Sequence, residues 1–184
     1  SSVNQAKLLA DDGTANDAFG YDVAISGDTV IVGATKVDVD TKGVDVGAAY
    51  VFTRSGNRWQ QQARLIAEDG SANEEFGGKV ALWGDTAIVG VIRDDDDVKG
   101  VDSGSAYVFT RNGSRWSQQA KLTADDAAAG DALGWSIAVE GDTAVIGAPR
   151  DDDKGKDSGS VYVFARTGTR WHQQAKITAL DGQP

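Results

Sequence analysis

Acidic side chains offer the most suggestive spacing for chemistry in this chain. Three stretches place aspartates around a Lys-Gly pair, and in the middle one Asp95, Asp97 and Asp102 surround Lys99-Gly100. Ca²⁺ takes six to eight oxygen ligands, and loops of alternating aspartates supply them. The lysine in each stretch donates hydrogen bonds only and repels a cation. Two interpretations stay open: solvated hairpin loops, or weak Ca²⁺ binding with Asp95, Asp97 and Asp102 as ligands. No other cofactor is expected.

Two tryptophans are the candidates for binding a ligand. Trp83 and Trp135 have no counterpart at the same position elsewhere in the chain, whereas the remaining three tryptophans recur in one sequence context. Recurring aromatic residues are explained by packing, but packing symmetry does not require the other two. Trp83 and Trp135 are therefore predicted ligand-binding residues, with filling of the core as the alternative.

Catalysis finds little support in the composition. The chain has no cysteine and only one histidine, His172. Thiolate metal sites and cysteine nucleophiles are thus excluded, and neither a serine-nucleophile elbow nor a phosphate-binding glycine loop is present. The net charge is −10 over 184 residues. This acidic balance argues against nucleic acid, and no apolar run approaches the ~20 residues of a membrane span. We expect a protein that is not an enzyme.

The elements that position these residues form an internal repeat. The Gly-Asp-Thr turns at 27–29, 84–86 and 141–143 are spaced by 57 residues, and the Tyr-Val-Phe segments begin at Tyr50, Tyr107 and Tyr162. Glycine as the first residue of a two-residue connection favours a type II′ hairpin. Short β-branched and aromatic runs separated by turns predict an all-β fold.

Each repeat is predicted to form a four-stranded antiparallel meander, in which the inner strands are buried and the outer strand is half-exposed to solvent. We place these units at residues 20–68, 77–125 and 134–180. Residues 4–13 align with the fourth strand of each unit and predict one extra outer strand.

The repeats resemble the FG-GAP repeat of integrin α subunits and of many bacterial surface and secreted proteins. The resemblance rests on Phe19-Gly20 with Gly33-Ala34, on Phe76-Gly77 with Gly90, and on Leu133-Gly134 with Gly147-Ala148-Pro149. It implies β-propeller blades and an extracellular or cell-surface location. The calcium loop of the integrin-type repeat is replaced here by the short Gly-Asp-Thr turns, so its calcium sites do not carry over to these positions.

Three blades are too few to close, because propellers typically need four to eight. We therefore expect a homo-oligomer, in which a head-to-tail dimer forms a ring of six blades. A β-trefoil or β-prism, closed within one chain, is the rival fold.

The expected function is extracellular binding, adhesion or scaffolding, with a protein or glycan as ligand. A carbohydrate-binding lectin with one site per repeat is the alternative. Because the chain begins Ser1-Ser2 without methionine, we expect it to be processed or excised from a longer protein.

Overall fold

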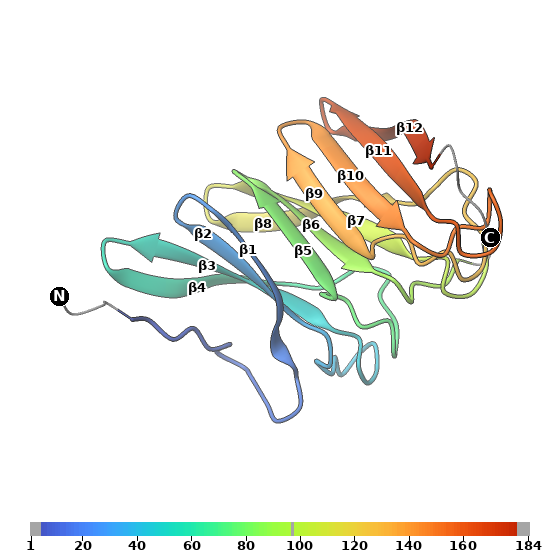
Figure 1. Cartoon of the computed structure of the whole chain (residues 1–184). Coiled ribbons are helices and arrows are strands. Elements are labelled where there is room, and N and C mark those ends of the chain that lie inside the picture. Colours follow the sequence, from blue (N-terminus) through green and yellow to red (C-terminus); the bar gives the residue numbers. More distant parts are fainter. Residues whose placement is uncertain (1–4, 97, 180–184) are drawn as a thin grey trace.

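The computed structural model describes residues 5–96 and 98–179 and consists of three four-stranded antiparallel sheets (Figure 1). The first sheet contains β1 (Phe19–Ser26), β2 (Thr29–Ala34), β3 (Ala48–Ser55) and β4 (Arg58–Leu65). The second contains β5 (Lys79–Trp83), β6 (Thr86–Val91), β7 (Ser105–Asn112) and β8 (Arg115–Leu122). The third contains β9 (Ser136–Glu140), β10 (Thr143–Ala148), β11 (Ser160–Thr167) and β12 (Arg170–Thr178). In each sheet the strands pair in chain order.

The predicted all-β fold is confirmed, and we call the three sheets blades 1, 2 and 3. They lie side by side, with the inner strands β1, β5 and β9 in contact, and do not close into a ring (Figure 1). Among the described residues there is no helix, and so none that could cross a membrane.

The first hairpin of every blade turns on glycine, as its sequence indicates. Gly27, Gly84 and Gly141 have φ of 57°, 53° and 57°, a region that glycine enters without steric cost. The aspartate that follows fixes the turn to the third strand. Asp28, for example, accepts a hydrogen bond of 2.8 Å from Nε of Arg54. The repeated Gly-Asp-Thr motif thus has a structural role.

The core lies between blades. We call the sheet surface that faces the preceding blade the front face and the opposite surface the back face. Between blades 1 and 2, small and branched residues of the back face meet larger residues of the front face. The back-face residues of blade 1 are Ile31, Ala49, Val51 and Leu65, and the front-face residues of blade 2 are Val80, Leu82, Val89, Tyr107 and Phe109.

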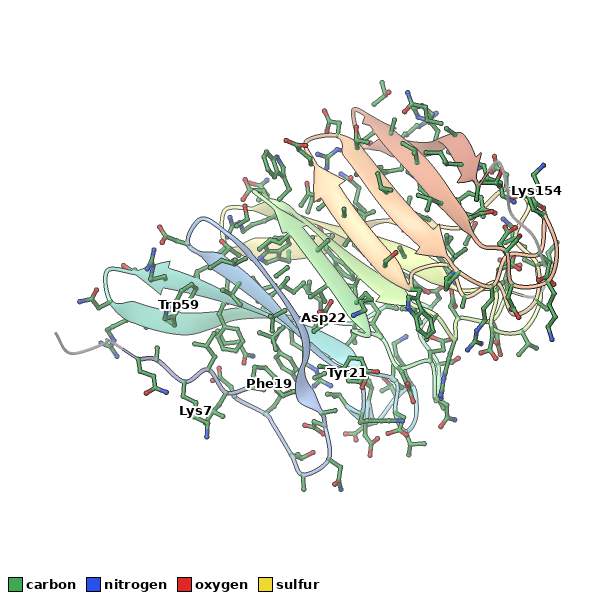
Figure 2. All side chains as sticks on the ribbon, viewed as in Figure 1. Lys7, Phe19, Tyr21, Asp22, Trp59 and Lys154 are labelled. Carbon is green, nitrogen blue, oxygen red and sulfur yellow. The ribbon has the colours of Figure 1, made fainter. Side chains whose placement is uncertain are left out.

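The predicted extra strand over 4–13 is not a strand in the part the structure describes. Residues 5–18 pair with no strand of the described chain, because it offers them no neighbouring strand with free backbone groups. They nevertheless lie against the front face of blade 1, where Leu8 and Ala10 pack beside Phe52 and Trp59. Figure 2 shows this segment, marked by Lys7, passing along the end of the stack that carries Phe19 and Trp59.

Candidate functional site

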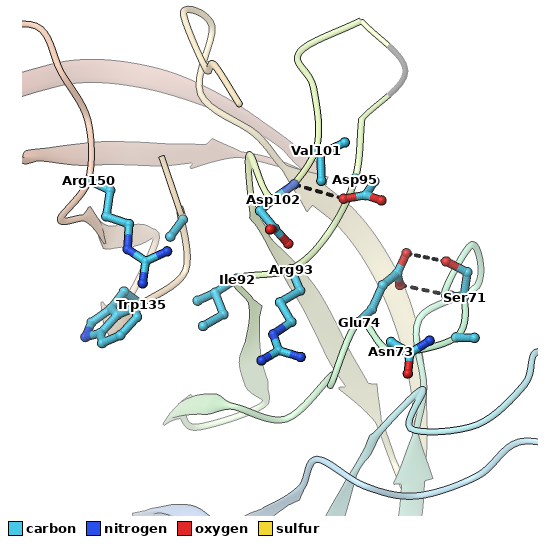
Figure 3. A pocket seen from close by; sticks show the side chains of 12 residues that line it. Ser71, Asn73, Glu74, Ile92, Arg93, Asp95, Val101, Asp102, Trp135 and Arg150 are labelled. Atoms are coloured by element: carbon cyan, nitrogen blue, oxygen red, sulfur yellow. Dashed lines mark hydrogen bonds between the residues drawn. The ribbon is translucent and has the colours of Figure 1, made fainter. Parts of the chain in front are cut away.

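A cleft of about 660 Å³ opens on the side of the array that carries the long loops (Figure 3). One wall is formed by residues 71–74, which lead into blade 2, and by the loop that follows β6. The other wall is formed by Trp135, just before β9, and Arg150, just after β10. Its charged and aromatic lining residues are Glu74, Arg93, Asp95, Asp102, Trp135 and Arg150. Two blades therefore build one hollow.

Trp135 and Arg150 form one wall of this cleft. Trp135 precedes β9 and is 44% exposed, so one face of its indole is available. The Cζ atom of Arg150 lies 5.7 Å from the centre of the indole ring, a cation–π arrangement. Among the described carboxylates none forms an ion pair with Arg150. Its guanidinium group is therefore exposed on an aromatic ring and keeps donors for a ligand.

Arg93 lies between this wall and the opposite one (Figure 3). Its Nη1 donates a hydrogen bond of 3.0 Å to Glu75, which also pairs with Lys36. Because Glu75 is shared between two cations, Arg93 is only partly neutralised. The side chain of Arg93 is 52% exposed and can reach into the cleft.

The opposite wall is acidic and held rigidly. The Glu74 carboxylate is buried and accepts hydrogen bonds from the Ser71 backbone N–H at 2.9 Å and the Ser71 hydroxyl at 2.6 Å. Burial raises the pKa of Glu74, and the Ser71 hydrogen bonds only partly offset this effect. Glu74 thus anchors the loop at 71–74 and shapes the wall.

The structure separates the two predicted ligand-binding residues. Trp135 lines the cleft, but Trp83 ends β5 beside the tight Gly84-Asp85 turn. Strands β5 and β9 occupy the same place in neighbouring blades, so the end of one and the start of the other lie on opposite sides of the array. Trp83 is 48% exposed but takes no part in the cleft.

Two of the three predicted metal ligands are described. Asp95 and Asp102 lie together, but the Oδ1 atom of Asp95 accepts a 2.8 Å hydrogen bond from the Asp102 backbone N–H. The same bond joins Asp38 to Asp45 at 2.9 Å and Asp152 to Asp157 at 2.6 Å, which makes it a loop-closing device. Asp97 lies outside the described residues. Within residues 5–96 and 98–179, no group of three or more metal-ligating side chains is placed to hold an ion.

Lysines of the outer strands β8 and β12 supply counter-charges to nearby aspartates of the acidic stretches. Asp94 is buried and its carboxylate lies 2.8 Å from Nζ of Lys121, which also binds Asp69 at 2.8 Å. Lys176 repeats this arrangement with Asp126, Asp151 and Asp153. Burial opposes the charge of Lys176, but hydrogen bonds to the three carboxylates outweigh it and raise its pKa. Two of the three acidic stretches are thus tied to the outer strands by half-buried lysines.

Sequence reasoning missed Arg93 and Arg150. A signal was present, since Lys36, Arg93 and Arg150 occupy the same repeat position just after the second strand of each blade. A basic residue kept at one position of an acidic repeat indicates a cation at each corresponding place in the fold. Only in blade 3 is the basic residue accompanied by a tryptophan, since the counterparts of Trp135 in blades 1 and 2 are Tyr21 and Gly78.

The fold and this cleft define a class of protein, an array of β-propeller blades with a hollow on the side of its long loops. The sequence profile of the FG-GAP repeat matches residues 3–52, 59–109 and 116–164. The chain therefore belongs to the FG-GAP repeat family, as the resemblance predicts. No curated protein matches the chain significantly.

Proposed function

We propose that this propeller module is a non-enzymatic binding or adhesion unit that works outside the cell or at its surface. FG-GAP repeats are typical of such proteins, which supports the location. The cleft lining holds no histidine, and His172 is an exposed residue of the outer strand β12. The guanidinium groups and the exposed indole that line the cleft are suited to binding a ligand.

The observation that carries this proposal is the pairing of Trp135 with Arg150 in the cleft. The arginines that lie on the three recurring tryptophans are each paired with an aspartate. Arg150 lies on Trp135 without an ion pair to any described carboxylate, although the net charge of the chain is −10. Arg93 adds a second guanidinium group nearby. Two guanidinium groups recognise carboxylates by charge-assisted hydrogen bonds, so the ligand is an acidic segment of a partner protein.

A saccharide is the second candidate, and the exposed face of Trp135 favours it. An aromatic platform bordered by fixed polar groups suits a sugar ring, and arginine suits the carboxylate of an acidic sugar. Because Tyr21 and Gly78 replace Trp135 in the other blades, a site built on this tryptophan occurs once in the chain.

An array of acidic peptides and of neutral and acidic oligosaccharides tests the proposal with the purified chain. We expect retention of acidic probes, a loss of about tenfold or more in affinity for Trp135→Ala and Arg150→Gln, and no change for Trp83→Ala. Trp83 is the matched control, because it is equally exposed and lies on the other side of the array. Equal binding by all four proteins, or no binding to any probe, would overturn the proposal. Peptides and sugars separate the two candidates.

A further inference from the structure

We propose that the front face of blade 1 docks on the back face of blade 3 of a second copy of the chain, so that two chains close a ring of six blades. This interface is independent of the ligand in the cleft. Its template is present twice within the chain, between blades 1 and 2 and between blades 2 and 3. The front face of blade 1 and the back face of blade 3 have the residues of such a contact, but no neighbouring blade covers them within the chain.

Burial shows the mismatch position by position. On the front face, Val23 and Ile25 of blade 1 are 61% and 66% exposed, whereas the corresponding Val80 and Leu82 of blade 2 are 6% and 8% exposed. On the back face, Val145 and Ile177 of blade 3 are 37% and 55% exposed. Their counterparts in blade 1, Ile31 and Leu65, are 0% and 4% exposed. Each exposed apolar residue therefore occupies a position that a neighbouring blade covers elsewhere.

Hydrogen bonding across blades shows the same gap. Nη1 of Arg111 in blade 2 lies 3.0 Å from the Thr29 hydroxyl of blade 1, and Nη1 of Arg166 in blade 3 lies 3.0 Å from the Thr86 hydroxyl of blade 2. Arg54, at the same position of blade 1, bonds only within its own blade. The corresponding acceptor, Thr143 of blade 3, is exposed. The proposed contact brings Arg54 of one chain to Thr143 of the other.

A glycine identifies where the two backbones meet. A Cβ atom on Gly33 or Gly90 would collide with the carbonyl oxygen of Gly77 or Gly134 in the following blade. Gly147 occupies this position in blade 3, and a Cβ there would meet only the Ser136 side chain of its own blade. At Gly33 and Gly90 the backbone of the following blade leaves no room for a side chain. Within one chain, no following blade approaches Gly147 in this way. Gly20 of a second copy would supply it.

Residues 5–10 occupy the part of the front face of blade 1 on which the second copy would dock. Leu8 corresponds to Leu65, Leu122 and Ile177, and it packs on the front face of blade 1 as Leu65 does on blade 2. The Asp11 N–H donates to the Gln61 side chain at 2.9 Å, and the Glu68 N–H donates to Gln118 at 3.0 Å in the same way. In the ring, residues 174–179 of the second copy take the place of residues 5–10.

A second copy is the occupant that these observations specify. Its blade 3 back face carries the threonine, the glycine and the apolar residues that the template requires at each position. Three blades from each chain give six, within the range in which propellers close, and two head-to-tail contacts complete the ring.

Sedimentation velocity on the full chain and three aspartate variants tests this pairing at micromolar concentration. Ile25→Asp places a charge on the front face and Val145→Asp places one on the back face. Because both residues are exposed in the single chain, the fold should tolerate them. Val98→Asp is the matched control, since Val98 is 92% exposed in a loop away from both faces.

We expect the wild type and Val98→Asp to sediment as two chains, and each face variant to associate about a hundredfold more weakly, because the junction would bury an unpaired charge. Mixing the two face variants should restore a two-chain species, since one intact front face then meets one intact back face. A monomeric wild type, a ladder of larger assemblies, a dimer unaffected by either face variant, or a mixture that stays monomeric would overturn the proposal.

Discussion

Nη1 of Arg111 in blade 2 lies 3.0 Å from Oγ1 of Thr29 in blade 1, so the third strand of one blade is tied to the second strand of the blade before it. The same guanidinium group pairs with Asp85, in the first hairpin turn of blade 2, and lies 5.2 Å from the centre of the Trp116 ring. One side chain therefore joins a hairpin, an aromatic anchor and a neighbouring blade. The stack is held together by repeated polar contacts as well as by its apolar core.

Replacing the arginine in blade 3 should cost more stability than replacing it in blade 1. We expect Arg166→Met to lower the free energy of unfolding by about 2–3 kcal/mol, because bonds to Thr86 and Asp142 and the stacking on Trp171 are lost. Arg54→Met should cost about 1 kcal/mol, because Arg54 is 47% exposed and has no contact across blades. Urea unfolding at low protein concentration measures both, and equal losses would contradict the assigned role.

Two glycines at the same repeat position should respond differently to an added methyl group. Gly90→Ala should destabilise the chain by about 2–3 kcal/mol, because the new Cβ meets the backbone of Gly134. Gly147→Ala should cost less than about 1 kcal/mol, because the Ser136 side chain can rotate away. Thermal and urea unfolding compare the two variants at a protein concentration low enough to keep the chains single, so that contacts with a second copy do not contribute. A Gly147→Ala protein as unstable as Gly90→Ala would show that the methyl group strains blade 3 itself.

The Lys176 cluster should make stability fall in acid. Burial alone would raise the pKa of Asp126 and Asp151, but hydrogen bonds from Lys176 and Tyr162 outweigh it and hold both pKa values below their usual range. Since these pKa values are lower in the folded chain, the stability they contribute is complete above about pH 4 and is lost as the pH falls through the lowered values.

Lys176→Met should remove about 3 kcal/mol at pH 7, because Asp151, which is 4% exposed, keeps a buried charge without its cation. The remaining stability should vary less between pH 5 and 3 than in the wild type. Urea unfolding across this range is the measurement, with exposed Lys156 replaced by Met as the control. An unchanged pH profile in Lys176→Met would place the acid sensitivity elsewhere.

Weakening the N-terminal segment should strengthen the pairing of chains. Leu8 packs on the face that residues 174–179 of a second copy would cover, so the two compete. We expect Leu8→Ser to lower the dissociation constant about fivefold, because the competing segment loses part of its apolar contact. Sedimentation equilibrium measures the constant, and Leu9→Ser is the control because Leu9 is 62% exposed. Weaker association in Leu8→Ser would instead make the segment part of the junction.

The blades could be predicted from the sequence because local signals agree at every repeat. Gly27-Asp28 sets a hairpin, and the alternation in β3 around Tyr50 decides which side chains face each neighbour. The recurring Trp116 was correctly assigned to packing, where it is 9% exposed and donates to Gln62 at 2.8 Å. Period, turn chemistry and alternation are local properties, so one chain is enough to identify them.

The cleft could not be predicted in the same way, because it depends on contacts between blades. Arg150 meets Trp135 within blade 3, but Arg93 reaches the same cleft only through the stacking of blades 2 and 3. The strand expected at the N-terminus failed for a related reason, since a strand needs a neighbour with which to pair. The hydrogen bond from the Asp102 N–H to Asp95 could not be predicted either, because the spacing of aspartates does not show which backbone group each carboxylate oxygen accepts from.

Light scattering from low to high micromolar concentration gives the mass of the wild-type chain in solution and so shows whether two chains close the ring. Two open faces that complete each other predict one species of twice the chain mass, which gives way to the single chain only on dilution. A well-folded chain that keeps the mass of one copy at every concentration would contradict the ring of six blades.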